Sequence, residues 1–313
     1  MNPLKVFITG ATGFLGSHVV RQLLVRGHHV LAGHRANSDL WRLKAVRGDI
    51  ELVEADLSRR TSIENALRKH PPDAIINCAA YGVKYEEQDM QQAFMVNVYG
   101  TSHLILAAKE TGVSRFIHMG SCFEYGNKDH PVHEDEILEP TSIYGVSKAS
   151  GTLLALVFSK QNQVPLVAVR LFGLWGPLEG KDRLVPQVIG HCLTRTRLKL
   201  TGCEQIRDYL FVEDAAAMLA DLVEIPEFTP YEVFNLASGI PVKLRDFVTE
   251  IASLFHQEDL MLFGELPYRS TEMWHLVGNV EKWTTRVGKI RQSSISEGVK
   301  KLLEADDVRY EIH

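Results

Sequence analysis

Short apolar segments recur along the first half of the chain, separated by longer stretches in which apolar and polar residues follow a helical spacing. The apolar segments are KVFIT, HHVLAG, IELVEA, AIINCAA, RFIHMG and LVAVRLF. Strands that are apolar on both faces are typical of a parallel sheet covered by helices on both sides. The pattern therefore predicts an α/β fold with a doubly wound parallel sheet, and it places helices at about 91–111 and 143–161.

The alternation of strands and helices stops after Phe172. The next segment, GLWGPLEGKDRLVP, is rich in Gly and Pro, which is typical of a loop, and the regular pattern returns in RDYLFVEDAAAMLADLVE. The last third of the chain mixes short strand and helix signals. We therefore predict a large α/β domain formed by residues 1–172 and about 207–258, with a smaller region formed by about 173–206 and 259–313.

Composition and charge narrow the classes of partner. The chain has 313 residues, of which 45% are hydrophobic, and its formal net charge is -5. Because there is no general basic surface, we expect neither nucleic acid nor an anionic membrane as the main partner. No apolar stretch has the length of a membrane span, and glycines interrupt the N-terminal run that a signal peptide would need, so we expect a cytoplasmic protein.

The four cysteines are widely spaced along the chain and form no C-x-x-C motif. This distribution argues against both a disulfide framework and a zinc site. We expect reduced, mostly buried thiols and no bound metal.

A glycine-rich loop follows the first predicted strand, in VFITGATGFLGSHVVRQLL, and a helical pattern begins directly after it. Glycines at this spacing let the backbone turn tightly and approach a pyrophosphate, which then lies at the positive N-terminal end of the helix. We therefore expect the loop to bind a dinucleotide. The residues expected to line it are Gly10, Thr12, Gly13, Phe14, Leu15 and Gly16.

The end of the second predicted strand, VLAGHRAN, bears on the choice of cofactor. An acidic residue here would bind the ribose 2′-hydroxyl of NAD, whereas an Arg accommodates the 2′-phosphate of NADP. The chain has His34 and Arg35, with no carboxylate before Asp39. We therefore predict NADP(H), with Arg35 on the phosphate. The alternative is that Arg35 is solvated and that the protein uses NAD(H).

Tyr144 and Lys148 lie four residues apart in PTSIYGVSKAS, at the start of a helical pattern. This spacing puts both side chains on one helix face. A phenol with a pKa of about 10 is a poor base at neutral pH, and a nearby ammonium favours its ionised form, so we expect Lys148 to lower the pKa of Tyr144. By spacing alone, the two residues would also fit an ordinary amphipathic pair.

Several motifs together make the chain resemble the extended short-chain dehydrogenase/reductase family, in its branch of nucleotide-sugar epimerases, dehydratases and reductases. The resemblance covers nearly the whole chain, and the motifs occur in the family's order and spacing. They are TGATGFLG, Asp56 in EADL, NCAA, Asn97 in NVYGT, GSCFEYG, YGVSK, RLFGLWGP and RDYLFVEDAA. The resemblance implies a Rossmann fold, with dinucleotide binding in the large domain and nucleotide-sugar binding in the smaller region.

The resemblance also implies roles for individual residues. Tyr144 would be the acid/base, Lys148 its partner and a ribose ligand, and Ser121 would hydrogen-bond the substrate oxygen that is oxidised or reduced. Further cofactor contacts would come from His34, Arg35, Asp56, Leu57, Ala79, Ala80 and Asn97. Substrate contacts would come from Tyr81, Lys84, Cys122, Phe123, Gly173, Arg207 and Arg269. Arg207 and Arg269 would bind the diphosphate, because a guanidinium donates two hydrogen bonds at once; the alternative is an ion pair with Asp208 or Glu272.

The residues after Ser121 narrow the reaction. The dehydratases that this chain resembles have an acidic pair at the two positions after this Ser or Thr. This chain has Cys122 and Phe123 there. Glu124 is one residue late, and on an extended strand a shift of one residue turns the side chain to the other face. We therefore expect no dehydration, and we expect Glu124 to cap or ion-pair with nearby structure. The alternative, if the strand has already ended before Glu124, is a supporting catalytic role.

The remaining reactions need only Ser121, Tyr144 and Lys148. Because NADP(H) is predicted, we favour reduction of the C4 ketone of a nucleotide-diphospho-4-keto-6-deoxysugar. A nucleotide-sugar 4-epimerase acting through a transient ketone is the alternative, and a non-catalytic NADP(H)-binding regulator is a more distant one. The resemblance also implies a homodimer, formed through the helices expected at 91–111 and 143–161.

Overall fold

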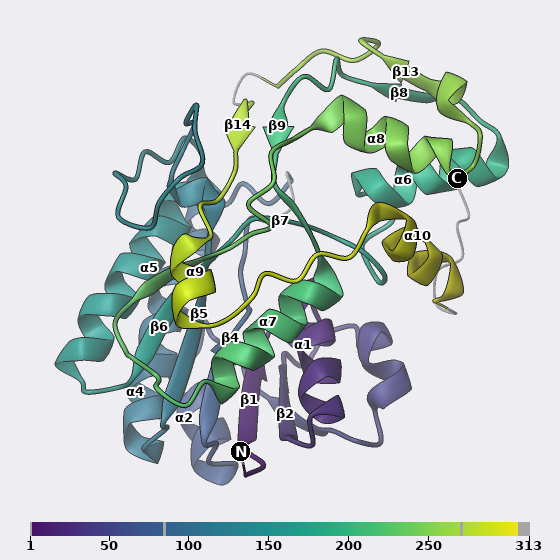
Figure 1. Ribbon diagram of the computed structural model, residues 1–313. Coiled ribbons are helices and arrows are strands. Elements are labelled where there is room, and N and C mark those ends of the chain that lie inside the picture. The colour runs from purple at the N-terminus through teal and green to yellow at the C-terminus, as the bar shows by residue number, and fades with distance from the viewer. Residues whose placement is uncertain (1, 84–85, 270–271, 306–313) are drawn as a thin grey trace.

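A large parallel sheet forms the centre of the protein and confirms the predicted fold class (Figure 1). The computed structural model describes residues 2–83, 86–269 and 272–305. Its seven-stranded sheet has the order β11-β6-β5-β4-β1-β2-β3, and every pairing is parallel. These strands are β1 (Lys5–Thr9), β2 (His29–His34), β3 (Glu51–Glu54), β4 (Ala74–Asn77), β5 (Arg115–Ser121), β6 (Leu166–Leu171) and β11 (Val233–Leu236).

Helices cover both faces of this sheet. On one face, α1 (Phe14–Val25) and α7 (Val212–Glu224) pack on side chains such as Val6 and Ile8 of β1. On the other face, α2 (Arg60–Lys69), α4 (Gly100–Thr111) and α5 (Ile143–Gln161) pack around Phe7. Successive residues of a strand point to opposite faces, so the fully apolar β1 contributes to both cores.

The helix expected at about 91–111 is continuous but contains one wide turn. It consists of α3 (Met90–Phe94), the π-helical turn η2 (Met95–Tyr99) and α4. Asn97 lies in that turn. Single π-turns within α-helices occur frequently at functional sites.

A second, smaller core lies beside the carboxyl end of the sheet. Its buried side chains include Trp175 and Phe247, and it is built by α6 (Leu184–Thr194), α8 (Leu244–Ser253), α10 (Ile295–Glu304), β8 (Leu198–Leu200) and β13 (Met261–Phe263). The remaining strands are β7 (Gly173–Trp175), β9 (Ile206–Arg207), β10 (Tyr209–Phe211), β12 (Val242–Lys243) and β14 (His275–Leu276). The other helical segments are α9 (Glu281–Arg286) and the short turns η1 (Trp41–Val46), η3 (Cys122–Glu124) and η4 (Glu258–Leu260). The residue boundaries predicted for the two regions stay a prediction.

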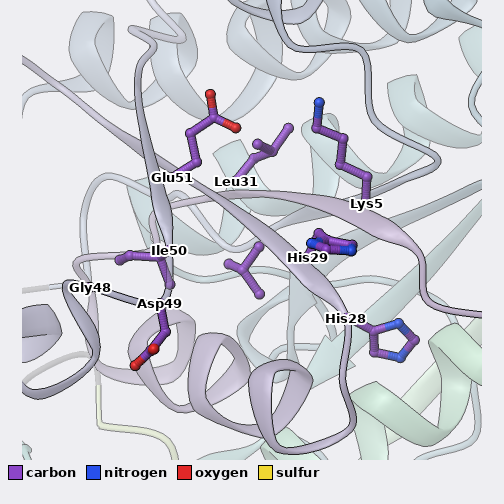
Figure 2. A pocket seen from close by; sticks show the side chains of 9 residues that line it. Lys5, His28, His29, Leu31, Gly48, Asp49, Ile50 and Glu51 are labelled. Atoms are coloured by element: carbon purple, nitrogen blue, oxygen red, sulfur yellow. The ribbon is translucent and has the colours of Figure 1, made fainter.

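The amino and carboxyl ends of the strands in the large sheet carry different sets of residues. A hollow at the amino ends of the strands is lined by Lys5 of β1, His29 of β2 and Glu51 of β3 (Figure 2). The glycine-rich loop and Ser121, which were predicted as site residues, lie at the carboxyl ends of β1 and β5. Carboxyl ends of parallel strands are the usual ligand side of such a sheet. Over the described ranges, no helix is long and apolar enough to cross a membrane.

Candidate active site

The glycine-rich loop forms a cradle at the start of α1. Gly10 has a φ of +65°, and a Cβ built there would lie 2.8 Å from the Ala79 nitrogen. At Gly16 a Cβ would lie 2.2 Å from the Gly10 carbonyl oxygen. No side chain caps the N-terminus of α1, because its N-cap residue is Gly13. The free N–H groups of the helix therefore face the space that a pyrophosphate would fill, so the loop fits a dinucleotide.

The ends of β2 and β3 supply the next group of predicted cofactor residues. His34 ends β2, and its Nδ1 atom lies 3.0 Å from the Arg35 carbonyl oxygen. Arg35 is exposed, and no side chain of the described residues pairs with its guanidinium. Asp56 accepts hydrogen bonds from the backbone and hydroxyl of Ser58, which hold the pKa of its carboxyl below the usual range despite partial burial. Leu57 is buried directly after it.

The segment after β4 is held by Asn97 from the π-turn. The Asn97 side chain accepts a hydrogen bond from the Tyr81 N–H at 2.9 Å and donates to the Tyr81 carbonyl oxygen at 2.9 Å and to Ser147 at 2.8 Å. Both of its donor hydrogens are therefore used within the protein. Asn97 thus links Tyr81 to Ser147 of α5, while the Ala79 N–H lies 3.4 Å from the Thr9 hydroxyl. Ala80 lies between Ala79 and Tyr81, and Lys84 lies outside the described residues.

The segment after β5 is a turn and not a continued strand. β5 ends at Ser121, and η3 begins at Cys122, so the sequence argument that placed Glu124 by strand alternation used the wrong backbone conformation. The expected contacts of Glu124 are nevertheless present: it caps the turn and forms a 2.8 Å ion pair with Arg170. The expectation of no dehydration stays a prediction. Cys122 is buried, and the ring of Phe123 packs edge-on against Tyr144 with centroids 5.8 Å apart.

Tyr144 lies in the first turn of α5, which Ser142 caps through a 3.0 Å hydrogen bond from the Gly145 N–H. Burial raises the pKa of Tyr144, whereas a hydrogen bond with the Ser121 side chain and the positive charge of Arg183 lower it. Burial dominates, and the pKa stays above its usual value. The direction is opposite to the one expected from the spacing of Tyr144 and Lys148.

Lys148 explains this difference. Its ammonium donates to the carbonyl oxygen of Met119 in β5, and its side chain is buried. Burial lowers the pKa of Lys148 to about 8, while the charge of Glu124 acts in the opposite direction. The lysine is therefore anchored to β5 of the sheet, two residues before Ser121.

The residues predicted for the diphosphate lie along β7 and β9. Gly173 in β7 pairs with Tyr209, and a Cβ at this position would lie 2.7 Å from the Asp208 carbonyl oxygen. The close approach of the two strands leaves no room for a side chain at Gly173 without a shift of the backbone. Arg207 in β9 forms a 2.8 Å ion pair with Glu272, so the ion-pair alternative is realised in this structure.

Arg269 is connected to the partner of Arg207 through the backbone. It is exposed, and its carbonyl oxygen accepts a hydrogen bond from the Glu272 N–H at 3.1 Å. Arg269 is therefore hydrogen-bonded through its backbone to the residue whose carboxylate neutralises Arg207. The charge of Arg207 reaches Cys122 of η3 and lowers the pKa of its thiol, although burial raises that pKa to about 12.

Two charged residues that the sequence interpretation missed lie in the segment GLWGPLEGKDRLVP. Arg183 donates to the Val83 carbonyl oxygen at 3.3 Å, and its charge reaches Tyr144. Burial raises the pKa of Glu179 to about 8, and one of its carboxylate oxygens is buried without a hydrogen-bond partner among the described residues. Charged residues within this Gly- and Pro-rich segment are the feature of the sequence that could have indicated them as site residues.

Comparison with known proteins identifies the family. The model of the NAD dependent epimerase/dehydratase family matches residues 6–237, which include the glycine-rich loop, Ser121, Tyr144 and Lys148. The chain belongs to this family. Membership of this family agrees with the Rossmann-type sheet and with the glycine-rich loop at the end of β1, which the sequence pattern had predicted.

Curated relatives in this family carry several activities. The dTDP-glucose 4,6-dehydratase of Escherichia coli is 28% identical over 81% of this chain and 77% of its own length. A probable UDP-glucuronate 4-epimerase of Rhizobium meliloti is 24% identical over 98% of both chains. Among solved structures, the UDP-glucuronic acid 4-epimerase of Bacillus cereus, in complex with UDP-glucuronic acid and NAD, has a TM-score of 0.86 at 24% identity and covers 96% of this chain and 98% of its own. This likeness shows the fold.

Proposed function

We propose that the protein oxidises or reduces C4 of the sugar in a nucleotide-diphosphate sugar, using a nicotinamide dinucleotide. The observation that carries this proposal is the placement of Ser121 at the carboxyl end of β5 beside Tyr144 in the first turn of α5, with the ring of Phe123 from the intervening turn packed against Tyr144. The glycine cradle at the end of β1 opens at the same edge. When bound, the dinucleotide supplies or accepts the hydride.

In this proposal Tyr144 moves the proton and Ser121 stabilises the oxygen. Burial keeps the Tyr144 phenol protonated by raising its pKa, so it is suited to donate a proton to a ketone oxygen at C4. The Ser121 hydroxyl donates a hydrogen bond to the same oxygen and stabilises the negative charge that develops there. In the oxidative direction the proton moves the opposite way: the C4 hydroxyl gives its proton to the Tyr144 phenolate, and Ser121 keeps its hydrogen bond to the same oxygen.

The net reaction that we favour is NADPH-dependent reduction of a 4-keto-6-deoxysugar. His34 and Arg35 at the end of β2 support NADP(H), because the position of the acidic residue that would bind a ribose 2′-hydroxyl is taken by an imidazole and the exposed guanidinium next to it suits a phosphate. Cys122 and Phe123 support reduction over dehydration, because neither side chain can act as a carboxylic acid in the elimination of water.

A nucleotide-sugar 4-epimerase is the second candidate. Relatives that match nearly the full length of this chain support it: the Rhizobium meliloti protein is named a probable UDP-glucuronate 4-epimerase, and the Bacillus cereus 4-epimerase was solved with NAD. Epimerisation needs the same Ser121 and Tyr144 chemistry in both directions. It consumes no cofactor, because the hydride returns to the sugar.

The deciding experiment supplies purified protein with NADPH and a panel of nucleotide-linked 4-keto-6-deoxysugars, and it follows the absorbance of the reduced nicotinamide. Stoichiometric loss of NADPH with formation of a 4-hydroxy sugar supports the reductase. Interconversion of a non-keto sugar without net cofactor loss, on protein that retains NAD, would replace it with the epimerase. No reaction of either kind would contradict both.

Cofactor choice has its own test in Arg35→Ala. If Arg35 binds the 2′-phosphate, the Kd for NADPH rises about tenfold or more while the Kd for NADH changes little, because only NADPH carries that phosphate. Arg47→Ala, in the exposed segment after η1, serves as the control for general loss of positive charge. Parallel changes for both cofactors in Arg35→Ala would assign NAD(H) and remove the main support for the reductase.

We further propose that Arg207 and Arg269 bind the diphosphate, with Tyr81 and Phe123 near the sugar. Arg207 is half-buried at the end of β9 and is already matched by a carboxylate at 2.8 Å, a geometry that a phosphate oxygen can adopt in its place. The positive charge of Arg207 is near enough to Cys122 of η3 to lower the pKa of its thiol. The diphosphate and the sugar would therefore lie on the same side of this turn.

A homodimer through the long helices is also part of the proposal. The outer faces of η2 and α5 carry exposed apolar side chains, with Tyr99 57%, Leu153 53% and Val157 60% exposed. Apolar side chains that gather on two adjacent helices are typical of a helix-helix interface. Light scattering on the wild type and on Leu153→Glu tests this: we expect a dimer that the charged residue dissociates, and a monomeric wild type would contradict it.

A further inference from the structure

Ser121 and the following turn η3 are together called the catalytic turn. The carboxylate of Glu124 is fully buried beneath this turn and accepts hydrogen bonds from three donors. One oxygen, Oε1, accepts the Ser121 N–H at 2.9 Å and the Thr152 hydroxyl at 2.7 Å. The other, Oε2, accepts the Nε–H of Arg170 at 2.8 Å, and both partners of this ion pair are inaccessible to solvent or nearly so. A buried carboxylate is costly unless it is paired and hydrogen-bonded, and this one satisfies both conditions.

The turn held by Glu124 determines what the Ser121 hydroxyl can do. The Phe123 N–H donates to the Ser121 oxygen at 3.2 Å within η3, and the Glu124 side chain closes the reciprocal hydrogen bond to the Ser121 N–H. A hydroxyl has one donor hydrogen and two acceptor lone pairs. The Phe123 N–H takes one lone pair, and no acceptor among the described residues takes the Ser121 hydrogen, so this hydrogen is available to a ligand on the side of η3 where the Phe123 ring packs against Tyr144.

We propose that Glu124 is a positioning residue for Ser121: together with Thr152 of α5 and Arg170 of β6, it holds the catalytic turn so that the Ser121 hydroxyl serves as a hydrogen-bond donor to the reacting oxygen. The proposal rests on the proposed function, which makes Ser121 that donor. Glu124 itself touches neither the reacting oxygen nor the dinucleotide. It acts through the backbone of the residue that does.

The same ion pair extends away from the site, which provides a matched control. Arg170 also donates to the Tyr125 hydroxyl at 2.9 Å and to the Glu134 carbonyl oxygen at 2.8 Å, and Tyr125 donates to Asn235 at 2.7 Å. Thr152 and Tyr125 therefore each contribute one fully buried hydroxyl to one network. The Thr152 hydroxyl contacts the oxygen that holds Ser121, whereas the Tyr125 hydroxyl lies on the far side of Arg170.

The experiment deletes single hydroxyl groups, because Glu124→Gln would leave the buried Arg170 without its anion and destabilise the whole fold. Thr152→Ala removes the near hydroxyl, Thr152→Ser keeps it on a smaller side chain, and Tyr125→Phe removes the far one. We expect Thr152→Ala to lower kcat about tenfold with the KM of the nucleotide sugar within twofold, because misplacement of a catalytic group affects the transition state most. Thr152→Ser and Tyr125→Phe should keep kcat within threefold of the wild type.

The comparison separates positioning from stability, because Tyr125→Phe should lower the Tm at least as much as Thr152→Ala does. If kcat follows the Tm across the three variants, or if Thr152→Ala leaves kcat unchanged, the positioning role is wrong. Recovery of kcat in Thr152→Ser, which differs from Thr152→Ala by one hydroxyl, supports it.

A second readout does not depend on the reaction. Hydrogen exchange of a peptide that contains residues 121–124 should become faster in Thr152→Ala and stay at the wild-type rate in Tyr125→Phe, because only the first variant weakens the hold on the Ser121 N–H. Equal exchange in all proteins would overturn the inference. If the wild type turns over no nucleotide sugar, the proposed function fails, and the exchange experiment still decides whether Glu124 and Thr152 hold the turn.

Discussion

The two ends of the proposed substrate site differ in how their polar groups are satisfied. At the reacting end, Glu124 is bound by Ser121, Thr152 and Arg170 at 2.7 to 2.9 Å within a fully buried network. At the proposed diphosphate end, Arg207 is paired with the carboxylate of Glu272, and 17% of its side chain remains accessible. The first end is complete before any ligand arrives, whereas the second must exchange a partner to accept one.

This difference predicts a division of labour. A group that is preorganised by the protein stabilises charge in the transition state without rearrangement, so changes at the reacting end should appear mainly in kcat. A group that exchanges one anion for another contributes to ground-state binding, so changes at the diphosphate end should appear mainly in KM. Substitutions at each end can break or sharpen this comparison.

The largest effect is expected for Tyr144→Phe, which removes the transferable proton and keeps the ring. We expect kcat to fall about 1000-fold, within the range for loss of a general acid, while the Kd of the dinucleotide changes little. Steady-state rates and cofactor fluorescence titration measure the two quantities. Activity within tenfold of the wild type would show that another group carries the proton.

The next largest effect is expected at the other end. Arg207→Met removes a charge-assisted contact to phosphate, so we expect the KM of the nucleotide sugar to rise about 10- to 100-fold with kcat within threefold. Arg245→Met, which removes a half-exposed guanidinium that pairs with Glu204, is the matched control and should leave KM unchanged. A fall in kcat without a change in KM would contradict the proposed division.

A smaller effect of opposite sign is expected for Glu272→Gln. The carboxylate competes with the diphosphate for Arg207 at 2.8 Å, and the amide competes less well, so KM should fall about two- to fivefold. Initial rates at several substrate concentrations measure it. In the double variant with Arg207→Met the gain should disappear, because no cation remains to be released; a gain that persists would place its cause elsewhere.

The last prediction concerns stability rather than turnover. Burial lowers the pKa of Lys148 from 10.5 to about 8, so below pH 8 the folded chain carries an ammonium at a cost of about 3 kcal/mol. Between about pH 8 and 10.5 the lysine is neutral in the folded state and protonated in the unfolded state, so this cost disappears as the pH rises. Lys148→Met should therefore be more stable than the wild type at pH 7, with the difference shrinking above pH 8.

Denaturant unfolding at several pH values measures that difference. Lys109→Met, at an exposed lysine of α4 that donates to Asn162, is the control and should shift stability by an amount that does not vary with pH. A constant difference for Lys148→Met as well would mean that Lys148 is not penalised by burial.

The parts of the molecule that could be predicted from sequence are those set by local pattern. Apolar segments on both faces predicted the parallel sheet, and the spacing of Gly10, Gly13 and Gly16 predicted the loop at the start of α1. Tyr144 and Lys148 lie on one helix because four residues make about one turn.

The parts that could not be predicted depend on partners distant in sequence. Glu124 is paired with Arg170, 46 residues away, and Arg183 reaches the Val83 carbonyl oxygen across 100 residues. The direction of the Tyr144 pKa shift depends on burial and on an ammonium that bonds to Met119 instead, and neither is encoded in an i, i+4 spacing. No pattern within one segment carries such information.

The pairing of Arg207 with Glu272 also bears on how fast a substrate arrives. A nucleotide sugar is a dianion, the chain has a net charge of -5, and the half-buried cation that would attract the diphosphate is neutralised before the encounter. Because Glu272 neutralises it, Arg207 contributes little to long-range attraction, so Arg207→Met should leave the salt dependence of the association rate constant nearly unchanged. The rate of diphosphate binding would then depend on how often the Glu272 carboxylate separates from Arg207.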